Sequence, residues 1–132
     1  MERDVQEEVS ARSARERQRA ETRERLFQAA LDEIRQEGVG GAQVDRIVAS
    51  VGVARGTFYF HFPTKEDVLI EYDRRRELEI VEVLQAVLQH GVPLRLALTG
   101  IVSAFTAIEA VPSERRLLLE TVALHVRHMA IR

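Results

Sequence analysis

Apolar residues recur along this chain at helical spacing, and the alternation typical of a half-buried β-strand is absent from the sequence. From about Glu21, one face of a helix is marked by the apolar residues Leu26, Phe27, Ala30, Leu31 and Ile34. Glycines at positions 38, 40 and 41 predict the end of this helix, because glycine readily adopts the conformation that follows a helix C-terminus. The pattern therefore predicts an all-α fold.

Two short helices are predicted next. The first is marked by apolar residues at i, i+3, i+4 and i+7, namely Val44, Ile47, Val48 and Val51, and Gly52 interrupts it. The second runs near 54–62, with Phe58 and Phe62 one turn apart, and Pro63 breaks it. Two short helices joined around a glycine and preceded by a helix are typical of a helix-turn-helix.

Three further helices follow in the prediction. The first is long and should begin at Thr64, because Thr64 and Asp67 form a capping-box pattern. The next two are expected over about 94–108 and from Pro112 to the end of the chain, since proline favours the first turn of a helix. These last two helices are rich in Leu, Ile and Val, so we expect them to have little to pack against in one small chain.

These elements divide the chain into three parts. We expect a polar N-terminal arm over 1–20, a three-helix helix-turn-helix domain over 21–68, and a helical C-terminal region over 69–132. The net charge is only −2, but residues 10–25 hold six arginines against three glutamates. We interpret this stretch as a solvated arm or a frayed helix, with the alternative that it is an extension that approaches phosphates.

The second short helix offers the residue types that read DNA. Projected at about 100° per residue, Phe58 and Phe62 point toward the preceding helix, and Phe60 points to the opposite side. Gly56 on that side allows close backbone approach, and Thr57 can hydrogen-bond a base edge or a phosphate. The outward side of this helix is therefore the candidate groove-facing surface.

Neighbouring residues extend this candidate surface. Tyr59 and His61 fall on the flanks, where each can reach a phosphate on one groove wall. Arg55 stands at the start of the helix and can make a bidentate contact to guanine. Lys65 lies in the first turn of the next helix, where free N–H groups already attract phosphate.

Other classes of function find little support in the sequence. The chain has no Cys, which excludes disulfides and thiolate metal sites. It shows no secretory signal, no apolar run of the roughly 18 residues that a membrane span needs, and no catalytic arrangement. His125 and His128 lie three residues apart, but no carboxylate pair of matching spacing is near them in the chain. We therefore expect a cytoplasmic protein that is not an enzyme and uses no metal or cofactor.

The segment 51–62, with the sequence VGVARGTFYFHF, and the segment 65–69, KEDVL, resemble the signature of the tetracycline-repressor (TetR) family of transcriptional regulators. Residues 22–24 and 29–31 also match the family's first helix, so the resemblance covers about 20–70. It implies an all-helical repressor that binds double-stranded DNA as a homodimer. In the family, the two subunits bind a pseudo-palindromic operator, and the C-terminal domain holds a small-molecule ligand.

Carried over by position, the resemblance assigns DNA contacts to Gln43, Arg55, Thr57, Tyr59, His61 and Lys65. It also implies that the helix-turn-helix motif spans about 43–62. The chain departs from the family pattern at two helix caps. Ala42 and Ala54 stand where hydroxyl residues are common, so we expect weak capping of both short helices.

The sequence also ends after its sixth predicted helix, and the two long C-terminal helices that usually form the dimer bundle in this family are missing from the prediction. The resemblance therefore implies that 21–68 is the DNA-binding domain and that 69–132 is a shortened helical C-terminal region for regulation and dimerisation. This leaves an alternative function open. The chain would then be a truncated helical interaction module that pairs with a full-length relative or another protein, without specific DNA binding of its own.

Overall fold

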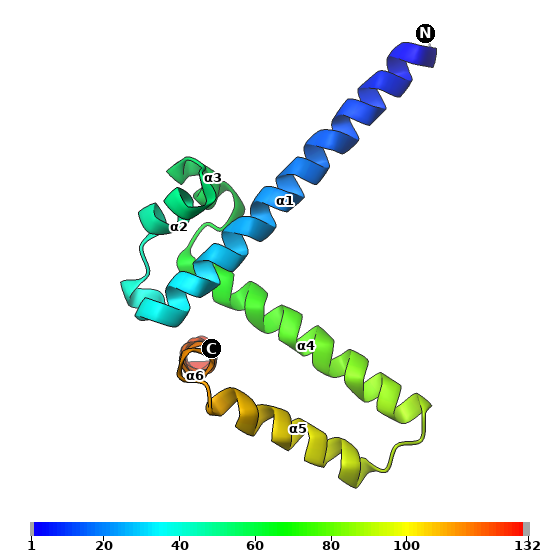
Figure 1. Cartoon of the computed structure of the whole chain (residues 1–132), viewed down its shortest axis with the longest axis vertical. Coiled ribbons are helices and arrows are strands. Elements are labelled where there is room, and N and C mark those ends of the chain that lie inside the picture. The colour runs from blue at the N-terminus through cyan, green and yellow to red at the C-terminus, as the bar shows by residue number, and fades with distance from the viewer. Residues whose placement is uncertain (1, 131–132) are drawn as a thin grey trace.

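The computed structural model describes the backbone of residues 2–130 and most side chains within it. The side chains of 2–5, 105, 108, 109, 128 and 130 lie outside the described part. The expectation that His128 binds no metal therefore stays a prediction. The described residues form helices and no strand, which confirms the all-α fold (Figure 1). The elements are α1 (Glu2–Gly41), α2 (Val44–Val51), α3 (Arg55–His61), α4 (Lys65–Gln89), α5 (Leu94–Glu109) and α6 (Pro112–Ala130).

The start of α1 is the main correction to the predicted elements. The helix begins at Glu2 and projects far beyond the other helices, whereas the apolar pattern predicted a start near Glu21 (Figure 1). Residues 6–21 are exposed, so they need no apolar face and leave no periodic signal. They contain neither Gly nor Pro, and pairs such as Arg12–Glu16, at 3.4 Å, support the helix locally. Within residues 2–130, no helix combines the length and the apolar character that crossing a membrane requires.

The core lies where α1, α2, α3 and the first turns of α4 meet. Phe27 of α1 stacks on Phe62, which follows α3, with ring centroids 6.3 Å apart. The ring centroid of Phe58 in α3 lies 5.8 Å from that of Phe62, and Phe58 is completely buried. Val68 and Leu69 close this cluster from α4 and are also completely buried. The four helices therefore share one aromatic and aliphatic core.

The helix caps follow the sequence in part. The capping box predicted at Thr64 and Asp67 is present, with the Asp67 carboxylate accepting from the Thr64 N–H at 2.7 Å. Ala54 caps α3 without a side-chain hydrogen bond, as predicted. The cap of α2 is Gln43, whereas Ala42 was expected there. Ala42 is buried instead.

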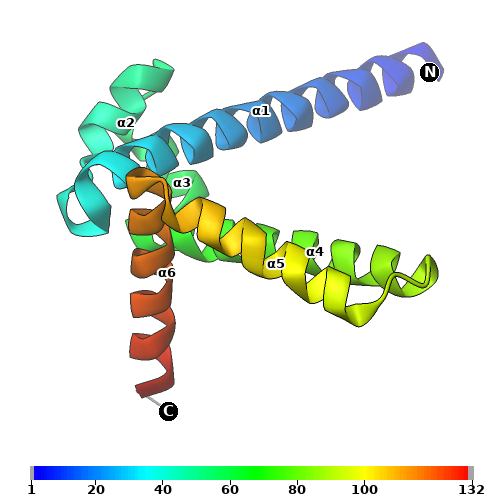
Figure 2. The ribbon, with the colours of Figure 1, turned by 60° about the horizontal axis from the view of Figure 1, so that its bottom comes forward.

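Helix α6 packs across the C-terminal end of α1 (Figure 2). Leu117 and Leu124 of α6 are buried and join the same core. Glu114 accepts a hydrogen bond from Arg35 at 2.7 Å, and Glu120 accepts one from the Val39 N–H at 3.1 Å. The expectation that this helix has little to pack against is therefore wrong, because one of its faces covers α1. Most of the large apolar residues described on α5 are exposed, as expected.

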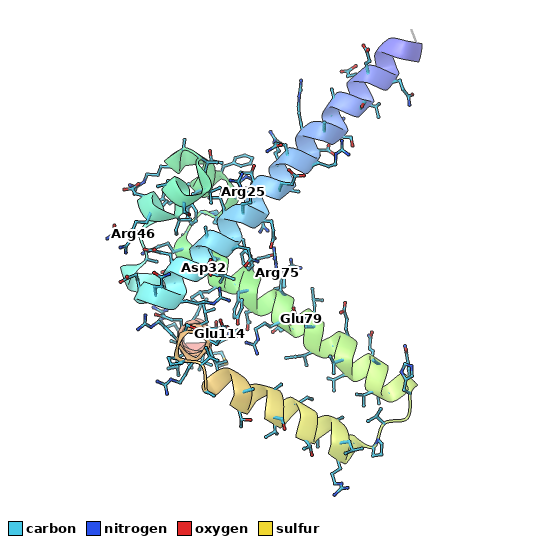
Figure 3. All side chains as sticks on the ribbon, in the orientation of Figure 1. Arg25, Asp32, Arg46, Arg75, Glu79 and Glu114 are labelled. Atoms are coloured by element: carbon cyan, nitrogen blue, oxygen red, sulfur yellow. The ribbon has the colours of Figure 1, made fainter. Side chains whose placement is uncertain are left out.

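A cluster of charges joins α1 to α4 beside the aromatic core. Arg75 of α4, labelled in Figure 3, donates to both carboxylate oxygens of Glu24 at 3.0 and 2.9 Å. It also donates to Glu71 at 2.9 Å, and its guanidinium carbon lies 4.0 Å from the centre of the Phe27 ring. Burial alone would raise the pKa of Glu71. Hydrogen bonds from Arg74 and Arg75, with the charge of Arg23, outweigh burial and lower that pKa to about 2.

This lowered pKa predicts how stability responds to acid. The folded-state pKa of Glu71 lies below its unfolded value of 4.5. The ionised carboxylate therefore stabilises the folded state fully above about pH 4.5, and this stabilisation is lost as the pH falls toward 2. We expect Glu71→Gln to lower the free energy of unfolding by about 1 to 3 kcal/mol at pH 7. The difference from the unchanged protein should disappear near pH 2, as measured by urea denaturation across this range.

Glu79→Gln is the matched control, since Glu79 is an exposed carboxylate on the same helix. A Glu71→Gln protein whose stability differs from the unchanged protein by the same amount at every pH would contradict the assignment.

Candidate nucleic-acid interface

Helix α3 presents two different faces because alternate phenylalanines have opposite surroundings. Phe58 and Phe62 are 0% and 1% exposed, whereas Phe60 is 65% exposed. Phenylalanine is among the residues most often buried, so an exposed ring between two buried ones marks a distinct surface. The faces are those that the projection predicted, with the Phe58 side against the core and the Phe60 side toward solvent.

The outward face of α3 borders a shallow hollow of about 410 Å³. Four of its lining residues, Gly56, Thr57, Phe60 and His61, were predicted site residues. A Cβ atom built on Gly56 would meet nothing within 4 Å, so the space in front of this backbone is open. The structure therefore brings these four residues together on one accessible surface.

The other side of the hollow is built by α1, from Gln18, Arg19 and Thr22. The guanidinium carbon of Arg19 lies 5.6 Å from the centre of the Phe60 ring, within the range of a cation–π contact. The predicted site residues did not include this part of α1. The excess of arginine over residues 10–25 was the signal, but without a helical register it could not be placed against α3.

Arg55, at the start of α3, is held by an ion pair with α2. Its Nη1 donates to both oxygens of Asp45 at 2.9 and 3.0 Å, and its Nη2 lies 3.5 Å from the Tyr59 hydroxyl. The hydrogen bond to Tyr59 and the charge of Asp45 raise the pKa of Arg55. Both partners of the ion pair are exposed, and exposed pairs of this kind are weak. The guanidinium can therefore exchange Asp45 for another acceptor.

Lys65 and Gln43 form the other end of the predicted site. The Lys65 ammonium donates to the Ala42 carbonyl at 2.8 Å, which ties the start of α4 to the loop before α2. Gln43 follows Ala42 and its side chain is exposed. The ammonium keeps further N–H donors beyond the one used by Ala42. This end of the site thus offers two donors to an acidic partner.

His61 differs from the cations around it. Burial lowers its pKa, and the nearby charges of Arg23 and Arg19 lower it further. Both effects favour the neutral imidazole, which can act as a hydrogen-bonding group. Its ring also packs edge-on against Phe60, with centroids 4.9 Å apart.

Comparison with known proteins points to one family. Residues 26–72 match the family model described as "Bacterial regulatory proteins, tetR family". The HTH-type transcriptional regulator SrpR of Pseudomonas putida is 40% identical over 62 residues, which cover 46% of this chain and 29% of SrpR. The uncharacterized HTH-type transcriptional regulator TtgW, also of Pseudomonas putida, is 40% identical over 62 residues, covering 46% of each chain.

The fatty acid metabolism regulator protein of Bacillus subtilis (strain 168) is 33% identical over 60 residues, covering 46% of this chain and 31% of that protein. The chain thus spans less than half the length of each of these relatives. No solved structure matches the chain. The matched residues contain α2, α3 and the packed parts of α1 and α4, so the similarity to the tetR family of bacterial regulatory proteins lies in the helix-turn-helix part of this chain.

Proposed function

We propose that this chain is a DNA-binding transcriptional regulator that places α3 in the major groove. The observation that carries the proposal is the exposed face of α3, where Gly56, Thr57 and Phe60 lie together opposite the buried Phe58. The major groove of B-DNA is about 12 Å wide and admits one helix. The DNA-binding domain would cover 21–68, with 69–132 as the regulatory and dimerisation region.

Each outward residue has a role in this pose. The Gly56 backbone approaches the groove floor, the Thr57 hydroxyl bonds a base edge or a phosphate, and Phe60 packs on a thymine methyl group. Tyr59 is 42% exposed and bonds a phosphate on one groove wall, with the neutral His61 bonding the other. Some of these contacts read the bases, and the phosphate contacts position the protein on the DNA backbone.

Arg55, Lys65 and Gln43 complete the proposed contacts. Arg55 leaves its exposed pair with Asp45 and binds guanine, so that the ion pair holds the guanidinium near the groove before DNA arrives. Lys65 and Gln43 donate to phosphates beside the N-terminus of α4, where the helix dipole favours negative charge.

The long α1 adds a second basic contact. Arg15 and Arg19 are one helical turn apart and lie within about 40° of each other around the helix axis. Arg19 already touches Phe60, so this side of α1 continues the outward surface of α3. Arg15 lies about 6 Å further along the axis, close to the spacing of successive phosphates on one strand. This side of α1 would then contact phosphates that flank the recognised bases.

A regulator of this kind acts as a homodimer, and the C-terminal region offers apolar surface for pairing. Leu88 at the end of α4, Leu94 of α5 and Met129 of α6 are 80%, 69% and 69% exposed. A cavity of about 490 Å³ between α4 and α5 is lined mainly by aliphatic residues such as Val83 and Ile101, and has the size of a small-molecule site. The proposed protein is a repressor in the cytoplasm of a bacterial cell, released from its operator by a ligand in this cavity.

Selection of bound sequences from a pool of random duplex DNA tests the function. We expect enrichment of a pseudo-palindrome with half-sites about one helical turn, or 34 Å, apart, because two copies of α3 would enter successive major grooves. Recovery of no common sequence, from a protein that remains folded, would instead favour an interaction module that pairs with other proteins.

Substitutions in the site should separate positioning from base reading. Lys65→Ala should weaken binding to all sequences and reduce the slope of log affinity against log salt by about 1, since one phosphate contact is lost. Arg55→Ala should reduce the discrimination between bases at one position of the DNA site by about 1 to 3 kcal/mol of binding free energy. Fluorescence anisotropy over a range of salt concentrations measures both effects, with Arg95→Ala on α5 as the control. An unchanged salt slope for Lys65→Ala would contradict the docking pose.

The proposed contact of α1 has a matched control on the same helix. Arg15→Gln should reduce the salt slope by about 1, as expected for the loss of one phosphate contact. Arg17→Gln should leave it unchanged, because Arg17 is about 160° away around the helix axis. Equal effects of the two substitutions would mean that α1 attracts DNA only through its overall charge.

A further inference from the structure

Three side chains that can bind a metal meet between α4 and α6. Asp73 and Glu77 lie one turn apart on α4, and His125 faces them from α6. One candidate ligand atom from each residue lies within 4.8 Å of the other two. The closest contact joins His125 Nε2 to Asp73 Oδ2 at 3.4 Å. The three residues also border a hollow of about 360 Å³, whose other lining residues include Thr121 and Leu124.

The position of His125 is set by its own helix. Thr121 and Leu124 are buried, which fixes this part of α6 against its neighbours. The Nδ1 atom of His125 lies 3.4 Å from the Thr121 carbonyl oxygen, one turn earlier. In the tautomer with the proton on Nδ1, this N–H donates to the carbonyl and the Nε2 lone pair faces the carboxylates. Histidines that bind metals are commonly held by such a second hydrogen bond.

We propose that Asp73, Glu77 and His125 bind a divalent transition-metal ion of the zinc type. One imidazole and two carboxylates provide three ligands, and water from the open hollow can take the fourth position. The imidazole favours zinc over magnesium and calcium, which prefer oxygen ligands throughout. Arg74 also lines the hollow, but its guanidinium donates to Glu71 at 3.0 and 3.2 Å and is thus held by that carboxylate.

The ion would join two helices that serve different parts of the protein. Helix α4 begins at Lys65 beside the DNA-binding surface, and α6 belongs to the C-terminal region. A metal bridge would therefore hold the C-terminal helix against the helix that leads to the DNA-binding domain. The site does not depend on the proposed DNA binding, so it can be tested without DNA.

Two measurements on the chelator-treated protein test the proposal. Calorimetry measures the binding of Zn²⁺ during a titration, and thermal unfolding is compared with and without Zn²⁺. We expect one ion per chain with a micromolar dissociation constant, and an increase in Tm because the ion binds only the folded state. His125→Ala and Asp73→Asn should each weaken binding at least tenfold and remove the increase in Tm. Mg²⁺ at the same concentrations should produce neither effect.

His90→Ala is the matched control, since His90 is an exposed histidine that caps the C-terminal end of α4. It should bind Zn²⁺ as the unchanged protein does. His125 is itself 54% exposed, so His125→Ala is expected to fold, and circular dichroism checks that it does. The proposal is overturned if the unchanged protein binds no Zn²⁺, if Mg²⁺ binds equally well, or if His125→Ala binds Zn²⁺ with unchanged affinity.

Discussion

The packing of Phe58 and Phe62 against Phe27 is the interaction on which the candidate interface depends. Helix α3 has only seven residues and lacks a side-chain cap, so it is too short to be stable by itself. Two buried rings fix its rotation and leave Phe60 pointing outward. Truncation of one buried phenylalanine typically costs about 3 to 5 kcal/mol. The same contacts that stabilise the domain therefore determine which side of α3 meets a partner.

Further contacts connect this small domain to the rest of the chain. Arg75 bridges Glu24 of α1 and Glu71 of α4 beside the Phe27 ring, and Leu117 of α6 is buried in the same core. The C-terminal region is therefore packed against the domain that carries α3. A change in the position of α4 or α6 has a direct route to the proposed DNA-binding surface, as the proposed control by a ligand requires.

Hydrophobic spacing predicted the elements with buried faces, and the structure confirms them. The bounds of α2 were predicted closely because four valine and isoleucine positions mark one side of it. Those of α3 were predicted closely because two phenylalanines mark its buried side. The first half of α1 was missed because an exposed helix has no apolar period. The opposite faces of Phe58 and Phe60 were also predictable, since they follow from helical geometry alone.

Contacts between residues far apart in sequence could not be predicted in the same way. The pairing of Arg55 with Asp45, and the placement of Arg19 over Phe60, depend on how separate helices pack. The cluster around His125 is a similar case, because its carboxylates come from α4, far earlier in the chain. Spacing along the chain indicates which residues share a helix face, but three-dimensional packing decides which faces meet.

Site-directed photo-crosslinking tests most directly whether the outward face of α3 lies against DNA. A photoreactive phenylalanine analogue would replace Phe60 in one variant and Leu98, an exposed residue of α5, in another. The account predicts a covalent product with bound duplex DNA from position 60 and none from position 98. A protein that binds DNA but crosslinks from position 98 and not from position 60 would contradict it.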